Sequence, residues 1–247
     1  MPVREKITAS TIALARLRAR APRVQCLTNT VAQQITANTL LALGCRVSMA
    51  THIEEVLAMT ESADALLVNL GTLDAGRVEA IASLSKSARV RAMPVVLDPV
   101  FVEHSPLRMK LAREVLTWDR VIVKGNATEM AAFGDASARA CARITTGAVD
   151  QISTASDTVS VANGVPVMAQ VTGLGCALGA VVAAMSAVEP DALIASIAAL
   201  LTVEIAAEHA MHRSTGPGTF ASYLLDALAN FDPRDLASDA KLESHGT

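Results

Sequence analysis

Short apolar runs alternate with helical segments throughout this chain, and this alternation limits the fold more than any other feature. Apolar runs at Arg23–Leu27, Ala65–Leu70, Pro94–Leu97 and Arg120–Val123 have the length of buried strands. Strands separated by helices are joined by crossover connections, which place the strands in parallel. The sequence therefore predicts an α/β fold with a central, mostly parallel sheet and helices on both of its faces.

The other expected elements continue this pattern. Further strands are expected at Arg46–Ala50 and Arg143–Thr145, and helices at Thr8–Arg20, Val31–Leu43, Ile53–Met59, Ala75–Lys86, Leu107–Thr117, Met130–Cys141, Ala177–Val188 and Ala192–Val203. The last two tracts are apolar throughout but too short to span a bilayer. We expect them to be buried helices.

Polar residues directly follow the apolar runs. These residues are Thr28-Asn29, Asn69, Asp98, Asn126 and Thr146. Any one of them alone is a common turn former or helix cap. In an open parallel sheet, however, such positions share the carboxyl edge, where ligands bind. Their succession predicts a small-molecule site at that edge.

A turn with two glycines and a cysteine, Gly173 to Cys176, precedes an apolar helix. The first amides of a helix have no intrahelical partner, and glycines let a ligand approach the backbone closely. The turn is therefore a candidate phosphate site, and its field is expected to lower the pKa of Cys176. The alternative is a packing turn in which Cys176 is a small buried hydrophobe.

Composition narrows the partners. The 247 residues are 51% hydrophobic and carry a net charge of −3, without the basic surface that nucleic acid or a membrane would require. The four cysteines form no C-x-x-C pair, and the N-terminal segment lacks the apolar core of a signal peptide. We expect a cytoplasmic protein with reduced thiols and a single domain, 1–247, whose last residues, about 233–247, are a frayed tail.

A series of short motifs runs in order along the chain. The first are Thr28-Asn29-Thr30-Val31, Thr36-Ala37-Asn38, Leu40-Leu41-Ala42-Leu43-Gly44 and Met49-Ala50. The later ones are Asn69-Leu70-Gly71-Thr72-Leu73, Pro94-Val95-Val96-Leu97-Asp98-Pro99-Val100, Lys124-Gly125-Asn126-Ala127-Thr128-Glu129, Thr172-Gly173-Leu174-Gly175-Cys176 and Gly216-Pro217-Gly218-Thr219-Phe220. Together they resemble the hydroxyethylthiazole kinase family, over about residues 12 to 231. The first motifs and the order are specific, whereas other ribokinase-like kinases share the glycine turn.

The resemblance implies a ribokinase-like fold and a reaction. Members of this family transfer the γ-phosphoryl group of ATP to the hydroxyethyl group of 4-methyl-5-(2-hydroxyethyl)thiazole, in thiamine salvage. They require Mg²⁺ and form homotrimers with sites between subunits. Phosphoryl transfer depends on positioning and charge stabilisation, which a glycine turn and a set of polar side chains at strand ends are suited to supply.

The resemblance also assigns residues to roles. The catalytic centre comprises Cys176, Gly173 and Gly175, and the thiazole pocket comprises Asn29, Met49 and Gly173. ATP would contact Lys124 and Thr146, and Mg²⁺ would be organised by Asp98 and Glu129 with Asn126 in support. Oxygen ligands of this kind are the ones that magnesium prefers. Cys176 is expected to aid the chemical step without a covalent intermediate.

Some positions depart from the family pattern. Lys124 replaces an arginine, Leu174 a threonine, and Phe101 stands where a glycine-rich segment is expected. The segment between Asn126 and Thr146 is short, as if one strand-and-helix layer had been trimmed. Two alternatives therefore stay open: a thiazole-binding or regulatory homologue with little or no activity, and a hydroxymethylpyrimidine-type kinase. The Thr28–Met49 motifs argue against the second.

Overall fold

The computed structural model describes residues 1–245, which form one nine-stranded sheet in the order β2-β1-β3-β4-β5-β6-β7-β8-β9. The strands are β1 Arg23–Leu27, β2 Arg46–Ser48, β3 Ala65–Asn69, β4 Val95–Asp98, β5 Val121–Asn126, β6 Ala142–Thr146, β7 Asp150–Ser153, β8 Thr158–Val161 and β9 Leu242–Ser244. The α/β fold class is thus as expected from the sequence. β1 matches its expected bounds at both ends, the other expected strands differ by one or two residues at an end, and β5 extends three residues further than expected, to Asn126.

The sheet is parallel from β2 to β6 and antiparallel beyond it. Every pair among β2, β1, β3, β4, β5 and β6 is parallel, whereas β7, β8 and β9 each run opposite to the preceding strand. The expectation that strands and helices alternate throughout is therefore wrong after β6. The three missed strands are short, and β6, β7 and β8 are joined by tight turns, for which antiparallel pairing is the natural result.

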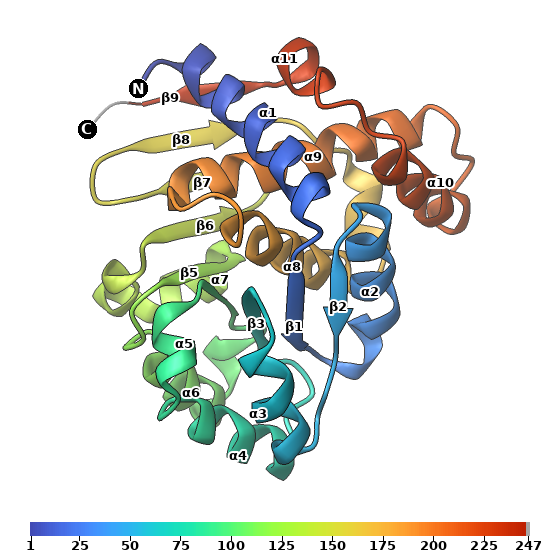
Figure 1. Ribbon diagram of the computed structural model, residues 1–247. Coiled ribbons are helices and arrows are strands. Elements are labelled where there is room, and N and C mark those ends of the chain that lie inside the picture. The colour runs from blue at the N-terminus through green and yellow to red at the C-terminus, as the bar shows by residue number, and fades with distance from the viewer. Residues whose placement is uncertain (246–247) are drawn as a thin grey trace.

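Helices cover both faces of the sheet (Figure 1). The α-helices are α1 Val3–Arg20, α2 Gln33–Ala42, α3 Ile53–Glu61, α4 Ala75–Leu84, α5 Ala88–Ala92, α6 Pro106–Val115, α7 Ala127–Phe133, α8 Leu174–Ser186, α9 Ala192–Met211, α10 Pro217–Ala229 and α11 Asp235–Asp239. Four 3₁₀ turns complete the described part: η1 Thr30–Ala32, η2 Val102–His104, η3 Gly134–Arg139 and η4 Pro166–Gln170.

Two hydrophobic cores lie on opposite sides of the sheet. Along β3, Ala65 and Leu67 belong to the core with α1, α2, α8, α9 and α10, whereas Leu66 and Val68 belong to the core with α3, α4, α6 and α7. Because both faces are covered, the central strands are apolar at nearly every position. This arrangement leaves the strand ends as the place where polar side chains gather.

Helix α8 packs closely on the sheet, and α9 packs on α8. A Cβ at Gly179 would stand 3.3 Å from Leu67 Cδ1, so the glycine allows this close approach. Helix α9 is 20 residues long and apolar enough to cross a membrane, but 83% of its most apolar window is buried inside the fold. It is longer than the tract expected from the sequence, and it is a core helix.

The C-terminal segment differs from the expected frayed tail. Its residues form α11 and then β9, which pairs with β8 at Val161 and Leu242. The buried Lys6 of α1 donates a hydrogen bond to Ser244 Oγ at 2.8 Å and pairs with Asp157 at 2.7 Å. Residues 246 and 247 of the expected tail lie outside the described residues.

The segment between Asn126 and Thr146 is short without leaving a gap in the sheet. It holds α7 and η3 before β6, and β6 pairs in parallel with β5 along five register positions from Ile122 to Asn126. The expected trimming therefore shortens a helical connection and removes no strand between β5 and β6.

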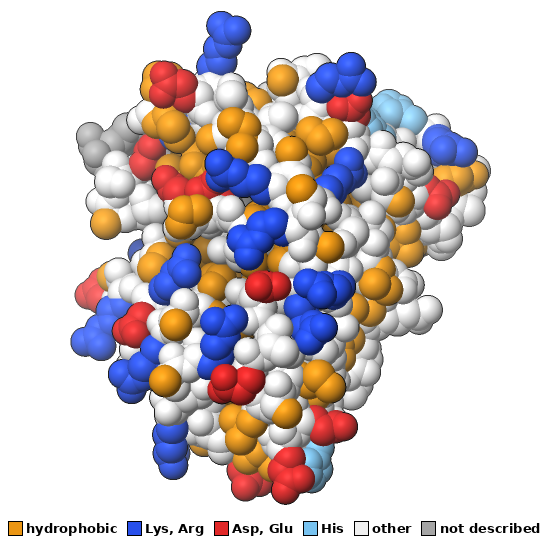
Figure 2. Space-filling model, in the orientation of Figure 1, with side chains coloured by type: hydrophobic (Ala, Val, Ile, Leu, Met, Phe, Trp, Pro, Cys, Tyr) orange, Lys and Arg blue, Asp and Glu red, His pale blue; other side chains and the backbone are white. Residues whose placement is uncertain are grey.

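On the face seen in Figure 2, basic side chains are interspersed with acidic and hydrophobic ones.

Candidate active site

The carboxyl ends of β1, β3, β4 and β5 meet at one edge of the sheet. The chain leaves β1 toward β2 on one side and returns to β3 on the other, which makes the β1–β3 border a topological switch point. Ligands of open α/β sheets bind outside such a border. Asn29 follows β1 and Asn69 ends β3, so two of the strand-end residues lie on either side of it.

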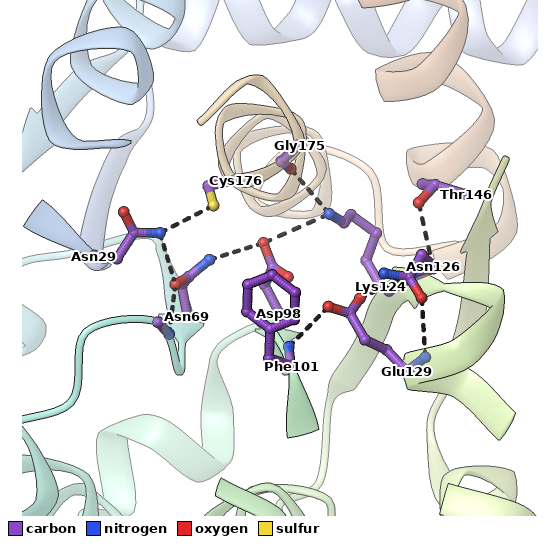
Figure 3. A network of polar contacts seen from close by, with 12 residues as sticks. Asn29, Asn69, Asp98, Phe101, Lys124, Asn126, Glu129, Thr146, Gly175 and Cys176 are labelled. Carbon is purple, nitrogen blue, oxygen red and sulfur yellow. Dashed lines mark hydrogen bonds and ion pairs between the residues drawn. The ribbon is translucent and has the colours of Figure 1, made fainter. Parts of the chain in front are cut away.

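A chain of hydrogen bonds crosses this edge (Figure 3). Asn29 Nδ2 donates to Cys176 Sγ at 3.2 Å and to Asn69 Oδ1 at 3.4 Å. Asn69 Nδ2 in turn donates to Asp98 Oδ2 at 2.8 Å. The Asn29 side chain also accepts from the Ala32 amide at 2.9 Å, which caps η1 and fixes its orientation. Three strand ends are therefore connected to the start of α8.

The turn before α8 has the geometry of an anion site. Gly173 has a φ of 84°, in the left-handed region that favours glycine. A Cβ there would stand 2.9 Å from Ala32 and from Ile35 Cγ2, so packing against η1 and α2 also requires glycine. Among the described residues, the amides of Gly175 and Cys176 have no hydrogen-bond acceptor. Free amides at the positive end of a helix dipole favour a negatively charged group.

Lys124 is buried beside this turn. Its Nζ donates to the Gly175 carbonyl at 2.9 Å and lies 3.5 Å from Asp98 Oδ2. Burial alone would lower the pKa of Lys124, but Asp98, followed by Cys176 and Glu129, raises it above its ordinary value. Lys124 therefore keeps its positive charge. Burial raises the pKa of Asp98, and Lys124 opposes that shift.

The Cys176 thiol differs from the expectation of a lowered pKa. Burial, and then the negative charge of Asp98, raises the pKa of Cys176 to about 11, against an ordinary value of 9.0. The nearby Lys124 lowers it by a smaller amount. The cost of removing a thiolate from water therefore exceeds the stabilisation from nearby positive charge, and Cys176 is a protonated thiol at neutral pH.

Glu129 and Asn126 form the N-terminal cap of α7. Asn126 Oδ1 accepts from the Glu129 amide at 3.0 Å, and Glu129 Oε2 accepts from the Asn126 amide at 2.8 Å. The other carboxylate oxygen accepts from the Phe101 amide at 2.9 Å. This reciprocal cap holds the Glu129 carboxylate at the edge of β5, where its negative charge raises the pKa of Asp98.

A cavity of about 600 Å³ opens on the far side of the α8 turn. It reaches from the ends of β6 and β8 to α8 and α9, and Thr146, Gly147, Gly164, Gly175 and Glu204 are among its lining residues. Thr146 Oγ1 donates to the Gly125 carbonyl at 3.4 Å. The volume is in the range of small-molecule and cofactor sites.

Most of the expected site residues meet at this edge. Those brought together around the α8 turn are Asn29, Asp98, Lys124, Asn126, Glu129, Gly173, Gly175 and Cys176. Thr146 lines the cavity, which Lys124 does not. Met49 follows β2 and is half-buried against the core on the α2 side, and among the described residues it makes no side-chain hydrogen bond to this network.

Sequence reasoning placed Asn69 at this edge without an individual role, and the structure shows that it joins Asn29 to Asp98. Two residues of the cavity wall, Asp150 and Glu204, were missed. Glu204 could have been noticed as a charged residue inside a long apolar helix. The helix expected from the sequence ended at Val203, one residue before it.

Comparison with known proteins gives a family for nearly the whole chain. The sequence model of the hydroxyethylthiazole kinase family matches residues 14–140 and 134–234. A protein described as a probable hydroxyethylthiazole kinase, from Agrobacterium fabrum, is 44% identical over 230 residues, covering 93% of each chain. The two matched ranges meet in η3, within the shortened connection.

Solved structures agree with this comparison. A hydroxyethylthiazole kinase protein from Pyrococcus horikoshii superposes with a TM-score of 0.89 at 34% identity, covering 96% of this chain and 98% of that one. A ribokinase-like superfamily protein from Enterococcus faecalis superposes with a TM-score of 0.62 at 15% identity, over 87% of this chain and 89% of that one. The second likeness concerns the fold alone.

Proposed function

Since this chain belongs to the hydroxyethylthiazole kinase family, we propose that it transfers the γ-phosphoryl group of ATP to the hydroxyethyl group of 4-methyl-5-(2-hydroxyethyl)thiazole. The family resemblance and the ribokinase-like fold expected from the sequence are both confirmed. Transfer of this kind requires two substrates that approach one charge-stabilising centre from opposite sides.

The observation that carries this proposal is the position of the α8 turn. Its unpaired amides at Gly175 and Cys176 lie between the Asn29 network and the 600 Å³ cavity. The turn touches both sides, because Gly173 packs against η1 while Gly175 lines the cavity. A phosphoryl group held by the turn would therefore face the thiazole alcohol on one side and the rest of the nucleotide on the other.

On the acceptor side, Asn29, Met49 and Gly173 would form the thiazole pocket. Cys176, protonated at neutral pH, would orient the acceptor hydroxyl instead of removing its proton. In a loose transition state the proton leaves late, so a strong base is not required. Cys176→Ser should lower kcat more than it weakens ATP binding, because it changes the size and hydrogen bonding of the group beside the hydroxyl. Unchanged turnover in that variant would contradict this role.

On the nucleotide side, ATP would occupy the cavity, with Thr146 at the end of β6 in contact with it. Lys124 would act at the phosphate end, since its buried ammonium lies beside Gly175 and outside the cavity wall. The departures from the family pattern at Lys124 and Leu174 leave this arrangement intact. Leu174 is a buried residue of the cavity wall, and the amides that follow it remain free.

The side chains present fit a magnesium ion that arrives with ATP. Asp98 at the end of β4 and Glu129 in the first turn of α7 are hard oxygen donors, with Asn126 at the end of β5 in support. Both Glu129 oxygens already accept backbone amides, and residues 1–245 contain no group of three or more His, Cys, Asp or Glu suited to a metal. Mg²⁺ is commonly held by one or two carboxylates, waters and substrate phosphates. When bound, the ion would neutralise phosphate charge.

The wider context is also part of the proposal. A role in thiamine salvage, a cytoplasmic location and a homotrimer follow from the family resemblance. Exposed apolar side chains support association between copies: Val31, two residues after Asn29, is 68% exposed, and Leu41, in the last turn of α2, is 56% exposed. A sizing measurement in solution, with and without ligands, tests the trimer directly.

The test of function is an assay of ADP release with Mg²⁺-ATP and a panel of thiazole and pyrimidine alcohols. We expect turnover with the hydroxyethylthiazole, and a phosphorylated thiazole as product by mass spectrometry. Turnover only with hydroxymethylpyrimidine would identify the alternative kinase. Thiazole binding in calorimetry without any ADP release would instead indicate a binding or regulatory homologue and contradict the kinase proposal.

A further inference from the structure

Helix α9 carries a carboxyl group into the wall of the large cavity. Glu204 is only 4% exposed, and its chain neighbours Val203 and Ile205 are apolar and buried. No hydrogen-bond donor within residues 1–245 reaches Glu204 Oε2. A buried carboxylate oxygen without a donor is costly, so the group requires a proton, a ligand or a partner.

The neighbour of Glu204 in this wall is another acid. Asp150 begins β7, is 7% exposed, and accepts the Gly147 amide on Oδ1 at 2.8 Å. The two carboxyl groups lie within hydrogen-bonding range of each other. Two ionised carboxylates are acceptors only and repel one another, whereas one proton between them turns the repulsion into a hydrogen bond.

We propose that Glu204 is a positioning residue for nucleotide binding: it shares a proton with Asp150, and this hydrogen bond ties α9 to the Gly147 turn. The inference rests on the proposed function, in which ATP occupies this cavity. Thr146, Gly147, Asp150 and Glu204 all line the cavity, and Asp150 also holds the turn through the Gly147 amide. The hydrogen bond between Glu204 and Asp150 therefore fixes the part of the cavity wall that Thr146 and Gly147 form.

The surrounding charges favour a retained proton. Burial, followed by Asp150 and Glu208, raises the pKa of Glu204 well above its ordinary value. Glu208 lies one helical turn further along α9 and pairs with Lys241 at 2.9 Å. Burial also raises the pKa of Asp150, against smaller opposing contributions that include Lys124 of β5. The charged groups that face the pair are Glu208 of α9 and Lys124 of β5. They supply too little positive charge to keep both carboxyl groups of the pair ionised.

Two substitutions at Glu204 separate a hydrogen-bonding role from mere occupancy. Glu204→Gln keeps the shape and supplies an amide donor to the Asp150 carboxylate, so its affinity for Mg²⁺-ATP should stay within about twofold of the wild type. Glu204→Leu fills the space without a donor and should weaken that affinity about tenfold or more, with a smaller effect on kcat. Glu79→Leu, at an exposed position of α4, is the matched control.

Affinity is measured by calorimetry with a non-hydrolysable ATP analogue, and KM and kcat separately with ATP. A Gln variant as weak as the Leu variant, or a Leu variant as tight as the wild type, would overturn the proposal. If Glu204→Leu does not fold, the affinity of Glu204→Gln for the ATP analogue and its infrared spectrum still test the proposal.

The shared proton has a spectroscopic signature that needs no substrate. The difference infrared spectrum between wild type and Glu204→Gln at neutral pH should contain the carbonyl stretch of a protonated carboxylic acid. An absent band in an enzyme that phosphorylates thiazole would refute this inference alone. A present band in a protein that binds the ATP analogue but phosphorylates no alcohol would refute the proposed function and leave the role of Glu204 standing.

Discussion

Replacing Gly173 by alanine adds one carbon at the most crowded point of the site. The residue has a φ of 84°, where an L side chain costs about 1–2 kcal/mol. The added Cβ would stand 2.9 Å from Ala32 and Ile35 Cγ2, and overpacking of this kind costs about 1–3 kcal/mol. The free energy of unfolding should therefore fall by about 2–5 kcal/mol.

Gly44 provides a matched control. Its φ is 86°, and a Cβ there would meet nothing within 4 Å. Gly44→Ala should therefore show the conformational cost alone, about 1–2 kcal/mol. The difference between the two variants isolates the steric cost of about 1–3 kcal/mol, and each kcal/mol lowers the melting temperature of a chain this size by about 2–4 °C.

The same substitution should also change the chemistry. Relief of the clash requires movement of η1 or α2 relative to the α8 turn, and η1 is capped by Asn29. Turnover of the thiazole alcohol should fall in Gly173→Ala at a temperature where it is fully folded, while Gly44→Ala keeps wild-type turnover. Urea unfolding and steady-state kinetics measure the two effects. Equal unfolding free energies for the two variants, or full turnover in Gly173→Ala, would refute the reasoning.

Three further predictions concern buried charge, buried thiols and backbone strain. Lys124→Met leaves its carboxylate partner buried and unpaired, so the free energy of unfolding should fall by about 3–5 kcal/mol and turnover should be largely lost; an active, equally stable variant contradicts this. Burial raises the pKa values of Cys26, Cys45 and Cys176 from 9.0, to about 12 for Cys45 and about 11 for Cys176. The thiols ionise at a lower pH in the unfolded chain than in the folded one, so the free energy of unfolding is unaffected below pH 9. It should fall between pH 9 and 11, by up to about 1.4 kcal/mol per pH unit for each thiol. In urea titrations, single Cys→Ala variants should show a smaller decrease of this free energy per pH unit. Phe101→Gly should raise the free energy of unfolding by about 0.5–1 kcal/mol, since its φ is 55° and the residue is 58% exposed; lower stability would show that the ring makes a net stabilising contact.

The central parallel strands β1, β3, β4 and β5 were predictable because they are buried on both faces. Runs such as Ala65–Asn69 are apolar at four successive positions and end in a polar residue, which identifies both the strand and its carboxyl end. The antiparallel half was not predictable in the same way. In β7 and β8, buried and half-exposed positions mix over four residues, which is too short a stretch to distinguish from a loop.

The candidate site also has a part that could be predicted from the sequence and a part that could not. Residues at the ends of parallel strands, such as Asp98 and Asn29, could be placed from sequence because strand direction fixes where they gather. Charge states could not, since they depend on packing. The position of Cys176 at the start of α8 pointed to a lowered pKa, whereas the burial that α8 acquires against the sheet raises it. The Glu204–Asp150 pair joins residues more than fifty positions apart, which no local pattern indicates.

The turn before α8 links the two halves of the reaction mechanically. Gly173 packs against η1 on the proposed acceptor side, and the Gly175 carbonyl accepts a hydrogen bond from the Lys124 ammonium while Gly175 itself lines the cavity proposed for the nucleotide. A displacement at either side therefore moves the amides that would hold the transferring phosphate. Phosphoryl transfer gains most of its acceleration from alignment and charge stabilisation, and errors of about 1 Å are costly. For this reason a residue without a direct role in the chemistry, such as Asn69, is expected to influence the rate through the position of this turn.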